Sequence, residues 1–416
     1  MDKLMSPRRV VFILSLLLGL QPVTTDLYLP ALPALTGWLG GSMTQAQLTL
    51  TALLLAFGAS QLVWGPLSDR YGRRPVLLAG LALYVLAALA CVAATSFPWL
   101  ISWRALQGVA LGAAVMCARA IVRDLYAPEA GARVMSQGLS GLGLMACASA
   151  VLGSVLAGTL GWRATLMALA LVGVITLAVI AWRYEETNLH PNPQALHAAS
   201  LLRTWRSILR HPTFVAFCAL SCASYAGLFT LLAASPFVFI QVLGWSPVEY
   251  GGAMLSTSLA YLGGTFLCRY LLTRHRVQRT VALAGGLSLL AGGVLLGLHF
   301  VGAYSGRFGG YALLLPINLF LVAHGIHQPC SQSGAVGPFP HAAGTASALN
   351  GFFMMCLAFA VGAWLGKSMG GMLWPLVAGM AFWSVCIAAV AWTLVARLNL
   401  PAPLKPSAAA ESAAAP

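Results

Sequence analysis

The sequence predicts an all-α, polytopic membrane protein with twelve transmembrane helices arranged as two six-helix bundles. Of the 416 residues, 59% are hydrophobic and only 8% are charged, whereas a soluble domain carries roughly 25% charged residues. Apolar runs recur along the whole chain, and about 20 such residues suffice to cross a bilayer as a helix. One long polar interruption, at about residues 184–212, divides these runs into two sets of six.

Twelve apolar runs are bounded by charges, glycines and prolines, which is typical of membrane-spanning helices. The first run follows Lys3, Arg8 and Arg9 and has some features of a signal peptide. Asp26 interrupts it, however, and eleven further runs follow, so we interpret it as a span. The predicted spans cover approximately residues 10–35, 45–66, 76–94, 99–122, 132–158, 164–182, 213–240, 247–272, 280–300, 309–333, 342–366 and 372–396.

The net charge of +14 reflects membrane topology rather than nucleic-acid binding, because the cations lie between apolar runs. A cytoplasmic N-terminus places most of the 23 lysines and arginines on the cytoplasmic side and only Arg163, Arg307 and Lys367 outside, with Arg104 and Arg119 inside a span. Both termini are therefore expected in the cytoplasm, as in a multi-pass protein of a bacterial inner membrane.

The central interruption predicts the domain organisation. Two six-helix halves around a loop are typical of a transporter whose substrate site lies between them at mid-membrane depth. Within the loop, one face of a short helix is apolar while its arginines point elsewhere, which indicates either a helix on the anionic inner leaflet or a solvated linker. We predict bundles at residues 1–183 and 213–397, a loop with an amphipathic helix at 184–212 and a disordered tail at 398–416. The apolar face comprises Leu201, Leu202, Trp205, Ile208 and Leu209.

The junction of the second and third spans carries a recognisable motif. It reads Gly-Pro-Leu-Ser-Asp-Arg-Tyr-Gly-Arg-Arg over residues 65–74. This resembles the Gly-x-Leu-x-Asp-Arg-x-Gly-Arg-Arg loop signature of the major facilitator superfamily, at the same topological place. The resemblance implies the major facilitator fold and a transporter that works by alternating access.

Three further segments resemble the drug:proton antiporter branch of that superfamily, specifically its bicyclomycin and chloramphenicol resistance (Bcr/CflA) group. They cover residues 25–33, 104–124 and 233–239. One departure concerns the fifth span, where antiporters of the superfamily usually carry a Gly-Pro pair. Here residues 148–154 read Ala-Ser-Ala-Val-Leu-Gly-Ser, which keeps small residues for tight packing but lacks the proline.

Asp26 is the only acidic residue that we place deep in the membrane. A carboxylate there costs about 2.5 to 3.5 kcal/mol and by default marks an ion pathway or substrate site. Arg104 in the fourth span is expected at comparable depth, so we predict that the two side chains pair and that protonation of Asp26 releases Arg104. A permanent ion pair that only sets helix packing is the alternative. One intramembrane carboxylate suggests one proton per cycle.

The loop signature is predicted to act as a conformational gate. Asp69 is expected to accept hydrogen bonds from the first amides of the eleventh span, near Gly344, as the family resemblance implies, and Arg73 to pair with Asp124. A cation cluster that only sets topology is the alternative. The residues assigned to this gate are Gly65, Asp69, Arg70, Gly72, Arg73, Arg74 and Asp124.

Other intramembrane polar and aromatic residues are candidates for the substrate site. Arg119 is expected either to reach lipid headgroups or to line the inner vestibule. His324 and His327 lie one helical turn apart and could relay protons or bind a metal, although polar packing is the simpler interpretation. The residues assigned to substrate binding are Asp26, Tyr28, Arg119, Tyr225, Phe229, Tyr261, Asn318, Asn350 and Phe353.

These observations predict a proton-coupled exporter of small amphipathic drugs, with the proton gradient as its energy source. Export or import of a native metabolite, such as an amino acid or nucleoside, is the alternative within transport. A membrane enzyme is not expected, because no nucleophile with a base, ligand triad or phosphate-binding loop is evident. No cofactor, metal or nucleic acid is expected, and the expected partners are a small-molecule substrate, protons and the lipid bilayer around a monomer. The nine cysteines lie almost all in apolar segments and are expected to pack as small hydrophobes.

Overall fold

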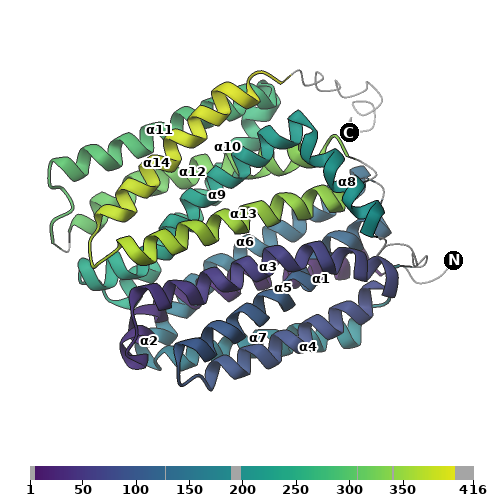
Figure 1. Cartoon of the computed structure of the whole chain (residues 1–416), viewed down its shortest axis with the longest axis horizontal. Coiled ribbons are helices and arrows are strands. Elements are labelled where there is room, and N and C mark those ends of the chain that lie inside the picture. The colour runs from purple at the N-terminus through teal and green to yellow at the C-terminus, as the bar shows by residue number, and fades with distance from the viewer. Residues whose placement is uncertain (1–4, 127, 189–197, 307, 340–341, 399–416) are drawn as a thin grey trace, which may run out of the picture.

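The computed structural model describes residues 5–126, 128–188, 198–306, 308–339 and 342–398, and these form helices and short connections without any strand. The long helices run side by side in one elongated bundle (Figure 1). The first residues of α1, the last residues of η4 and the short helix α8 lie at the same end, which we call the α8 end (Figure 1). The predicted tail from residue 399 lies outside the described residues.

The first six predicted spans all correspond to helices. The first is divided into three pieces, and the other five are single long helices. The elements are α1 (Pro7–Asp26), η1 (Leu29–Ala31), α2 (Leu32–Leu39), α3 (Met43–Tyr71), α4 (Arg73–Val92), α5 (Phe97–Leu125), α6 (Pro128–Thr159) and α7 (Trp162–Arg183).

The last six predicted spans also correspond to helices, and α8 precedes them in the central loop. The elements are α8 (Ala198–Arg210), α9 (Pro212–Pro236), η2 (Phe237–Val242), α10 (Pro247–Arg274), α11 (Val277–Phe300), α12 (Gly309–Val336), α13 (Ala343–Ser368), α14 (Trp374–Val390) and η4 (Ala391–Val395). In the described part of the chain, eleven helical segments are long and apolar enough to cross a membrane. The one remaining predicted span, residues 247–272, corresponds to α10, which carries Arg269 and Arg274 near its end and is less apolar.

Local sequence explains where several helices begin. Ser42 and Gln45 form a capping box at the start of α3, in which Ser42 Oγ accepts from the Gln45 amide at 3.3 Å. Ser246 and Glu249 form the same motif at the start of α10, where the distance is 3.2 Å. Each box satisfies amide donors that have no partner inside the helix. Polar turns thus separate apolar helices at the positions that the sequence predicts.

The first span of each half changes its helical form near proline. In the first span, α1 ends at Asp26 and the chain continues through the short turn η1 into α2, with Pro30 inside the turn. In the seventh span, α9 ends at Pro236 and continues as the π-helix η2. Proline lacks the amide that continues an α-helix, which favours such breaks. The first predicted span, residues 10–35, is thus present as the segment Pro7–Leu39, which is long and apolar enough to cross a membrane but contains a break after Asp26.

Helices from the two halves of the chain pack along two seams. One seam joins α3 with α13 and the other joins α6 with α10. The α3–α13 seam is closed at both ends of the bundle. Thr44 donates to the Gly366 carbonyl at 2.6 Å near one end, and Arg119 of α5 donates to Ser347 of α13 at 2.7 Å near the α8 end. The bounds predicted for two independent bundles remain a prediction.

The amphipathic helix expected in the central loop is present as α8. It lies across the end of the bundle, roughly perpendicular to the long helices (Figure 1), and contacts α9 and α13. Of its apolar residues, Ile208 is buried against the bundle, whereas Leu202 and Leu209 are exposed. Whether this exposed surface lies on a membrane leaflet stays a prediction.

Candidate functional site between the halves

Asp26 lies where the two halves meet. It is the last residue of α1, and its carboxylate accepts a hydrogen bond from Thr25 Oγ1 at 2.8 Å. The turn η1 that follows contacts α6 as well as α9 and α10 of the second half. Helix α6 approaches this turn closely at Gly153, which has no Cβ. A Cβ at this position would lie only 2.5 Å from the Leu27 carbonyl oxygen. The small residues of the fifth span, where the sequence lacks the expected proline, therefore pack against the break next to Asp26.

Two phenols of the second half lie near this carboxylate. Tyr225 of α9 and Tyr250 of α10 are both buried, and both lie within electrostatic range of Asp26. The Tyr250 hydroxyl also hydrogen bonds with Ser235 Oγ at 3.0 Å. Asp26 is thus placed so that a change in its charge acts on α9 and α10. Tyr225, which we assigned to substrate binding, is one of the candidates that the fold brings close to Asp26.

The predicted ion pair between Asp26 and Arg104 is wrong for this structure. The fully buried Arg104 donates from Nη1 to Gln107 Oε1 at 2.8 Å and from Nη2 to the Thr24 carbonyl at 3.2 Å. No ion pair joins it to Asp26, although the structure describes both side chains.

The end of α1 explains why Arg104 binds backbone instead. The Tyr28 amide bonds to the Thr25 carbonyl at 3.2 Å, so the Thr24 carbonyl has no partner within the helix. A helix C-terminus carries partial negative charge, and a guanidinium there satisfies the free carbonyl. Arg104 thus fixes the end of the helix that carries Asp26.

Tyr28 belongs to this interior cluster rather than to an open cavity. Its ring is fully buried and covers the Arg104 guanidinium, with Cζ 4.3 Å from the ring centroid. Its hydroxyl hydrogen bonds with Thr49 Oγ1 at 2.8 Å. These contacts use both the ring face and the hydroxyl, so Tyr28 holds Arg104 in place. Its assignment to substrate binding does not fit this conformation.

The remaining predicted substrate residues occupy different environments. Phe229 is buried, and its ring lies 3.1 Å from the position of a Cβ on Gly362. Tyr261 packs on His324 at 5.6 Å between ring centroids, and Asn318 hydrogen bonds with Ser256 Oγ at 3.3 Å. These side chains therefore pack within the second half and do not form the common aromatic wall that we predicted.

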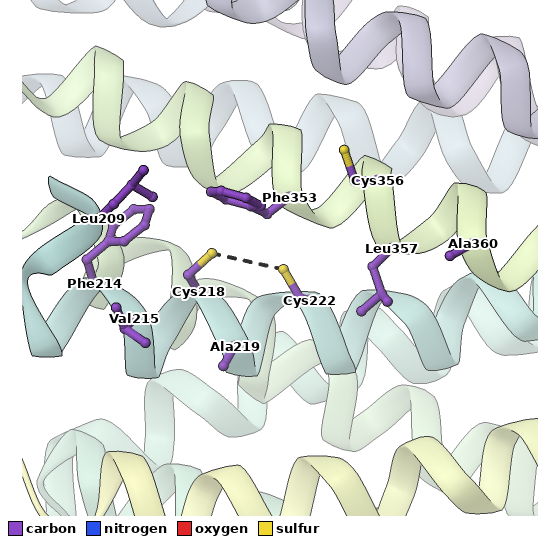
Figure 2. A pocket seen from close by; sticks show the side chains of 10 residues that line it. All are labelled: Leu209, Phe214, Val215, Cys218, Ala219, Cys222, Phe353, Cys356, Leu357 and Ala360. Atoms are coloured by element: carbon purple, nitrogen blue, oxygen red, sulfur yellow. Dashed lines mark hydrogen bonds between the residues drawn. The ribbon is translucent and has the colours of Figure 1, made fainter. Parts of the chain in front are cut away.

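Phe353 instead lines a groove on the outer surface of the bundle. The groove has a volume of about 520 Å³ and lies between α9 and α13, with Leu209 of α8 at one end (Figure 2). Phe353 and Val215 are both exposed there. Figure 2 shows Cys218 and Cys222 on its α9 wall, with their sulfurs 4.0 Å apart. Because the lining is apolar and faces away from α3, this groove is distinct from the site at Asp26.

The two histidines on α12 are hydrogen bonded to serines of neighbouring helices. His324 Nδ1 lies 2.7 Å from Ser224 Oγ of α9, and His327 Nε2 lies 3.4 Å from Ser288 Oγ of α11. In the described part of the chain, no group of three His, Cys, Asp or Glu side chains is arranged to hold a metal ion. Both histidines thus make polar contacts with neighbouring helices, and His327 Nδ1 has no hydrogen-bond partner among the described residues.

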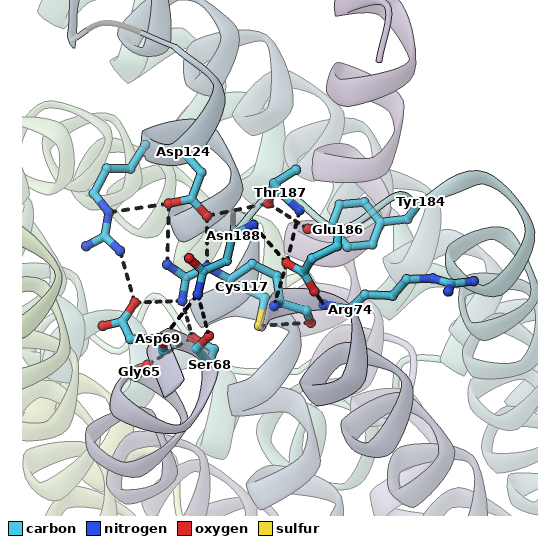
Figure 3. Close-up of polar contacts among 12 residues, drawn as sticks. Gly65, Ser68, Asp69, Arg74, Cys117, Asp124, Tyr184, Glu186, Thr187 and Asn188 are labelled. Atoms are coloured by element: carbon cyan, nitrogen blue, oxygen red, sulfur yellow. Dashed lines mark hydrogen bonds and ion pairs between the residues drawn. The ribbon is translucent and has the colours of Figure 1, made fainter. Parts of the chain in front are cut away.

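The loop signature forms a dense charge network at the α8 end, and Figure 3 shows the carboxylates Asp69, Asp124 and Glu186 that take part in it. Arg73 is buried, and its Nη1 lies 2.6 Å from Asp69 Oδ1 while its Nε lies 2.8 Å from Asp124 Oδ2. Arg123 adds a second cation, with Nη2 3.2 Å from Asp69 Oδ1. The predicted pairing of Arg73 with Asp124 is confirmed. We call Asp69, Arg73, Arg123, Asp124 and Glu186 the Arg73 cluster.

Glu186 is the member of this cluster that the sequence analysis missed. Its carboxylate accepts from the backbone amides of Arg73 at 2.9 Å and Arg74 at 2.8 Å, which are the first two residues of α4. A carboxylate at a helix N-terminus satisfies free amides and complements the helix dipole. Glu186 comes more than one hundred residues later in the chain, so no local pattern indicates this contact.

The same segment after α7 brings further polar groups to the cluster (Figure 3). Asn188 Nδ2 donates to the Asp69 carbonyl at 3.1 Å, and the Tyr184 hydroxyl hydrogen bonds with Thr187 Oγ1 at 2.8 Å. Burial raises the pKa of the Tyr184 phenol, so it stays neutral at physiological pH. The cluster therefore ties α3, α4 and α5 to the chain that leaves α7.

One predicted gate contact is not present, and Arg70, which we assigned to the gate, forms no ion pair in the described residues. Asp69 pairs with Arg73 and Arg123, and no described hydrogen bond joins it to the first amides of α13. Arg123 approaches α13 instead, with Nη1 3.5 Å from the position of a Cβ on Gly344. Arg70 is exposed and packs on Tyr71, with Cζ 5.4 Å from the ring centroid.

The motif glycines serve close approach and backbone geometry. Gly65 packs near α5, since its Cβ would lie 3.4 Å from Met116 Cε. Gly72 links α3 to α4 with φ of +97°, a backbone conformation that only glycine adopts readily. A Cβ on Gly72 would lie 2.6 Å from Glu186 Oε2. The motif therefore requires glycine at residue 72 for two independent reasons.

We expect Gly72→Ala to destabilise the protein by about 1 to 3 kcal/mol, because it adds backbone strain and displaces Glu186 from α4. The melting temperature of the purified protein in detergent measures the effect. Gly143→Ala in α6 is the control, because nothing lies within 4 Å of its added Cβ. Equal melting temperatures for the two variants would show that the Gly72 geometry is unimportant.

Comparison with known proteins identifies the class to which this fold and charge network belong. A sequence model of the Major Facilitator Superfamily matches residues 14–363, and the chain belongs to this family of membrane transporters. The crystal structure of a D-xylose-proton symporter superposes with a TM-score of 0.71 and 14% sequence identity, covering 92% of this chain and 97% of that chain. This likeness confirms the fold.

Within the family, several similar curated proteins carry drug-resistance names. A chloramphenicol resistance protein of Pseudomonas aeruginosa is 31% identical over 375 residues, which cover 87% of this chain and 83% of that protein. Multidrug resistance protein D of Escherichia coli is 29% identical over 344 residues, which cover 82% of this chain and 84% of that protein. A bicyclomycin resistance protein homolog of Haemophilus influenzae is 25% identical over 382 residues, which cover 91% of this chain and 94% of that protein. The resemblance to the Bcr/CflA group is confirmed.

Proposed function

We propose that this transporter exports small amphipathic drugs in exchange for protons, and that Asp26 carries the proton. The position of Asp26 is the observation that supports this most strongly. It lies at the break of the first span, where η1 contacts α9 and α10 of the second half. The other described acidic side chains lie at helix ends or in connections, namely Asp69, Asp124, Glu185, Glu186 and Glu249. An intramembrane carboxylate at a moving interface is suited to proton coupling.

The geometry suggests how protonation could act. Arg104 holds the Thr24 carbonyl and so fixes the end of α1, while Asp26 itself is held only by Thr25. We therefore assign Arg104 a positioning role and Asp26 the role of proton carrier. Protonation of Asp26 removes the negative charge near Tyr225 and Tyr250. Substrate binding in turn favours release of that proton. One proton per cycle would supply about 2.3 kcal/mol per 100 mV of membrane potential.

Alternating access requires contacts that close each end in turn. We propose that the α8 end faces the cytoplasm and closes through the Arg119–Ser347 hydrogen bond beside the Arg73 cluster. The opposite end would close through Thr44 with Gly366 and through Gln47, which donates to the Ala233 carbonyl. That carbonyl is free because the Phe237 amide bonds to Ala234 instead, at the change of helical form after Pro236. The break in the seventh span thus supplies a gate contact.

Proton flux in vesicles containing the purified protein tests this function. We expect chloramphenicol, a fluoroquinolone or a cationic dye to drive proton movement opposite to drug movement, and empty vesicles to show none. Drug movement without proton movement would contradict the coupling. Proton flux driven by a single amino acid or nucleoside, with none driven by any drug, would favour a metabolite transporter instead.

A further inference from the structure

The interior of the spans carries more positive than negative charge. Among the described residues, the charged side chains that lie within spans, are not exposed and belong neither to the Arg73 cluster nor to a helix cap are Asp26, Arg104 and Arg119. Neither arginine forms an ion pair there, since the described ion pairs all belong to the Arg73 cluster. The spans therefore hold two guanidiniums and one carboxylate outside the Arg73 cluster, and protonation of Asp26 increases the excess of positive charge. In a medium of low dielectric constant this excess repels cations and attracts anions.

Arg119 is the less satisfied of the two arginines. Arg104 donates two hydrogen bonds and lies under the Tyr28 ring. Arg119 donates one, from Nη1 to Ser347 Oγ across the halves, and no other hydrogen bond to it is found in the described residues. A guanidinium offers five N–H donors in a fork that matches a carboxylate. Arg119 is half-buried, and its remaining N–H donors have no hydrogen-bond partner among the described residues, so they are open to a ligand.

Two buried amide oxygens, one on α3 and one on α13, also lack partners among the described residues, while the Asn350 amide donates to Ser221 Oγ of α9 at 3.3 Å. Gln61 of α3 is 2% exposed and Asn350 of α13 is 3% exposed, and Oε1 of Gln61 and Oδ1 of Asn350 accept no hydrogen bond. A Cβ on Gly351 would lie 3.2 Å from Gln61 Oε1, so Gln61 faces α13 at this point. Residues 347, 350 and 351 share one face of α13, because residues three and four apart are neighbours on a helix. Unsatisfied buried oxygens favour a ligand that donates hydrogen bonds.

We propose that Arg119, Gln61 and Asn350 form a binding site for acidic or neutral substrates that carry an anionic or acceptor group together with hydroxyl or amide donors. Arg119 binds the acceptor group, and the two amide oxygens bind the donors. Permanently cationic substrates are excluded by the unpaired guanidiniums. This substrate class rests on the proposed function.

Binding to the purified protein tests the proposal without depending on proton coupling. The probes are nalidixic acid as an anion, chloramphenicol as a neutral molecule with hydroxyl and amide donors, and ethidium as a permanent cation. We expect nalidixate and chloramphenicol to bind at least about tenfold more tightly than ethidium. Arg119→Gln should weaken nalidixate binding by about tenfold, with a smaller effect on chloramphenicol, and Arg119→Lys should restore part of the loss.

Asn350→Asp provides a nearly isosteric second variant in case Arg119→Gln does not fold. It adds negative charge to the same seam, so we expect it to weaken nalidixate binding and strengthen ethidium binding. Three results would overturn the proposal. The wild type could bind ethidium as tightly as nalidixate, it could fail to bind nalidixate, or both variants could leave nalidixate binding unchanged. Proton flux driven by ethidium would leave the proposed function intact and show that the substrate class is wrong. The expected binding pattern without drug-driven proton flux would support the site and contradict proton coupling.

Discussion

Asp26→Asn is expected to reduce gradient-driven drug transport to the level of empty vesicles while the protein still folds. Asparagine has nearly the same shape as aspartate and can still accept the hydrogen bond from Thr25 Oγ1. It cannot bind and release a proton, however, so the coupling step is removed without a packing defect. Drug accumulation in everted vesicles with an imposed proton gradient measures the effect.

The matched control is Glu249→Gln, which neutralises a carboxylate in the capping box at the start of α10. This variant should transport as the wild type does, because Glu249 lies at a helix end. Downhill drug exchange without a gradient should persist in Asp26→Asn, which separates loss of coupling from loss of binding. Normal gradient-driven accumulation by Asp26→Asn would rule out Asp26 as the proton carrier.

Arg73→Gln is expected to cause the largest loss of stability among single changes in the Arg73 cluster. Arg73 is 2% exposed and contacts both Asp69 and Asp124, so its removal leaves Asp124 nearly buried without its main partner. Breaking a buried ion pair typically costs 3–5 kcal/mol, and we expect about 3 kcal/mol because Asp69 is 38% exposed. The melting temperature in detergent should fall by about 5 °C or more.

Arg70→Gln is the matched control for this prediction. Arg70 belongs to the same motif and carries the same charge, but it is exposed and packs only on Tyr71 among the described residues. Exposed interactions of this kind contribute little to stability, so its melting temperature should stay close to that of the wild type. Equal losses for Arg70→Gln and Arg73→Gln would mean that charge number, and not the buried geometry of Arg73, matters in this loop.

Most of the helical layout could be predicted because its physical cause is local. Crossing a bilayer requires long apolar runs, and the polar turns between them carry their own signals, such as the capping boxes at Ser42 and Ser246. The predicted spans therefore agree with the observed helices to within a few residues. The break after Asp26 also had a local signal in Pro30 and Pro33, but hydropathy alone merges the pieces into one span.

The candidate site was harder to predict because its contacts join distant segments. Comparable depth suggested that Arg104 would pair with Asp26, but depth does not define the direction in which a side chain points. The free Thr24 carbonyl, created by the end of α1, provides the partner for Arg104 instead. Glu186 likewise binds amides of α4 across a large separation in sequence. The pairing of Arg73 with Asp124 was predictable because both residues lie at span ends on the same side of the predicted topology.

The most direct test of proton exchange at Asp26 is to measure proton release when substrate binds to the purified protein in weakly buffered detergent solution. A pH-sensitive dye should report about one proton released per nalidixate or chloramphenicol bound by the wild type, and none released by Asp26→Asn even though substrate still binds. Equal release by both proteins would contradict this account, because the exchangeable proton would then reside elsewhere in the molecule.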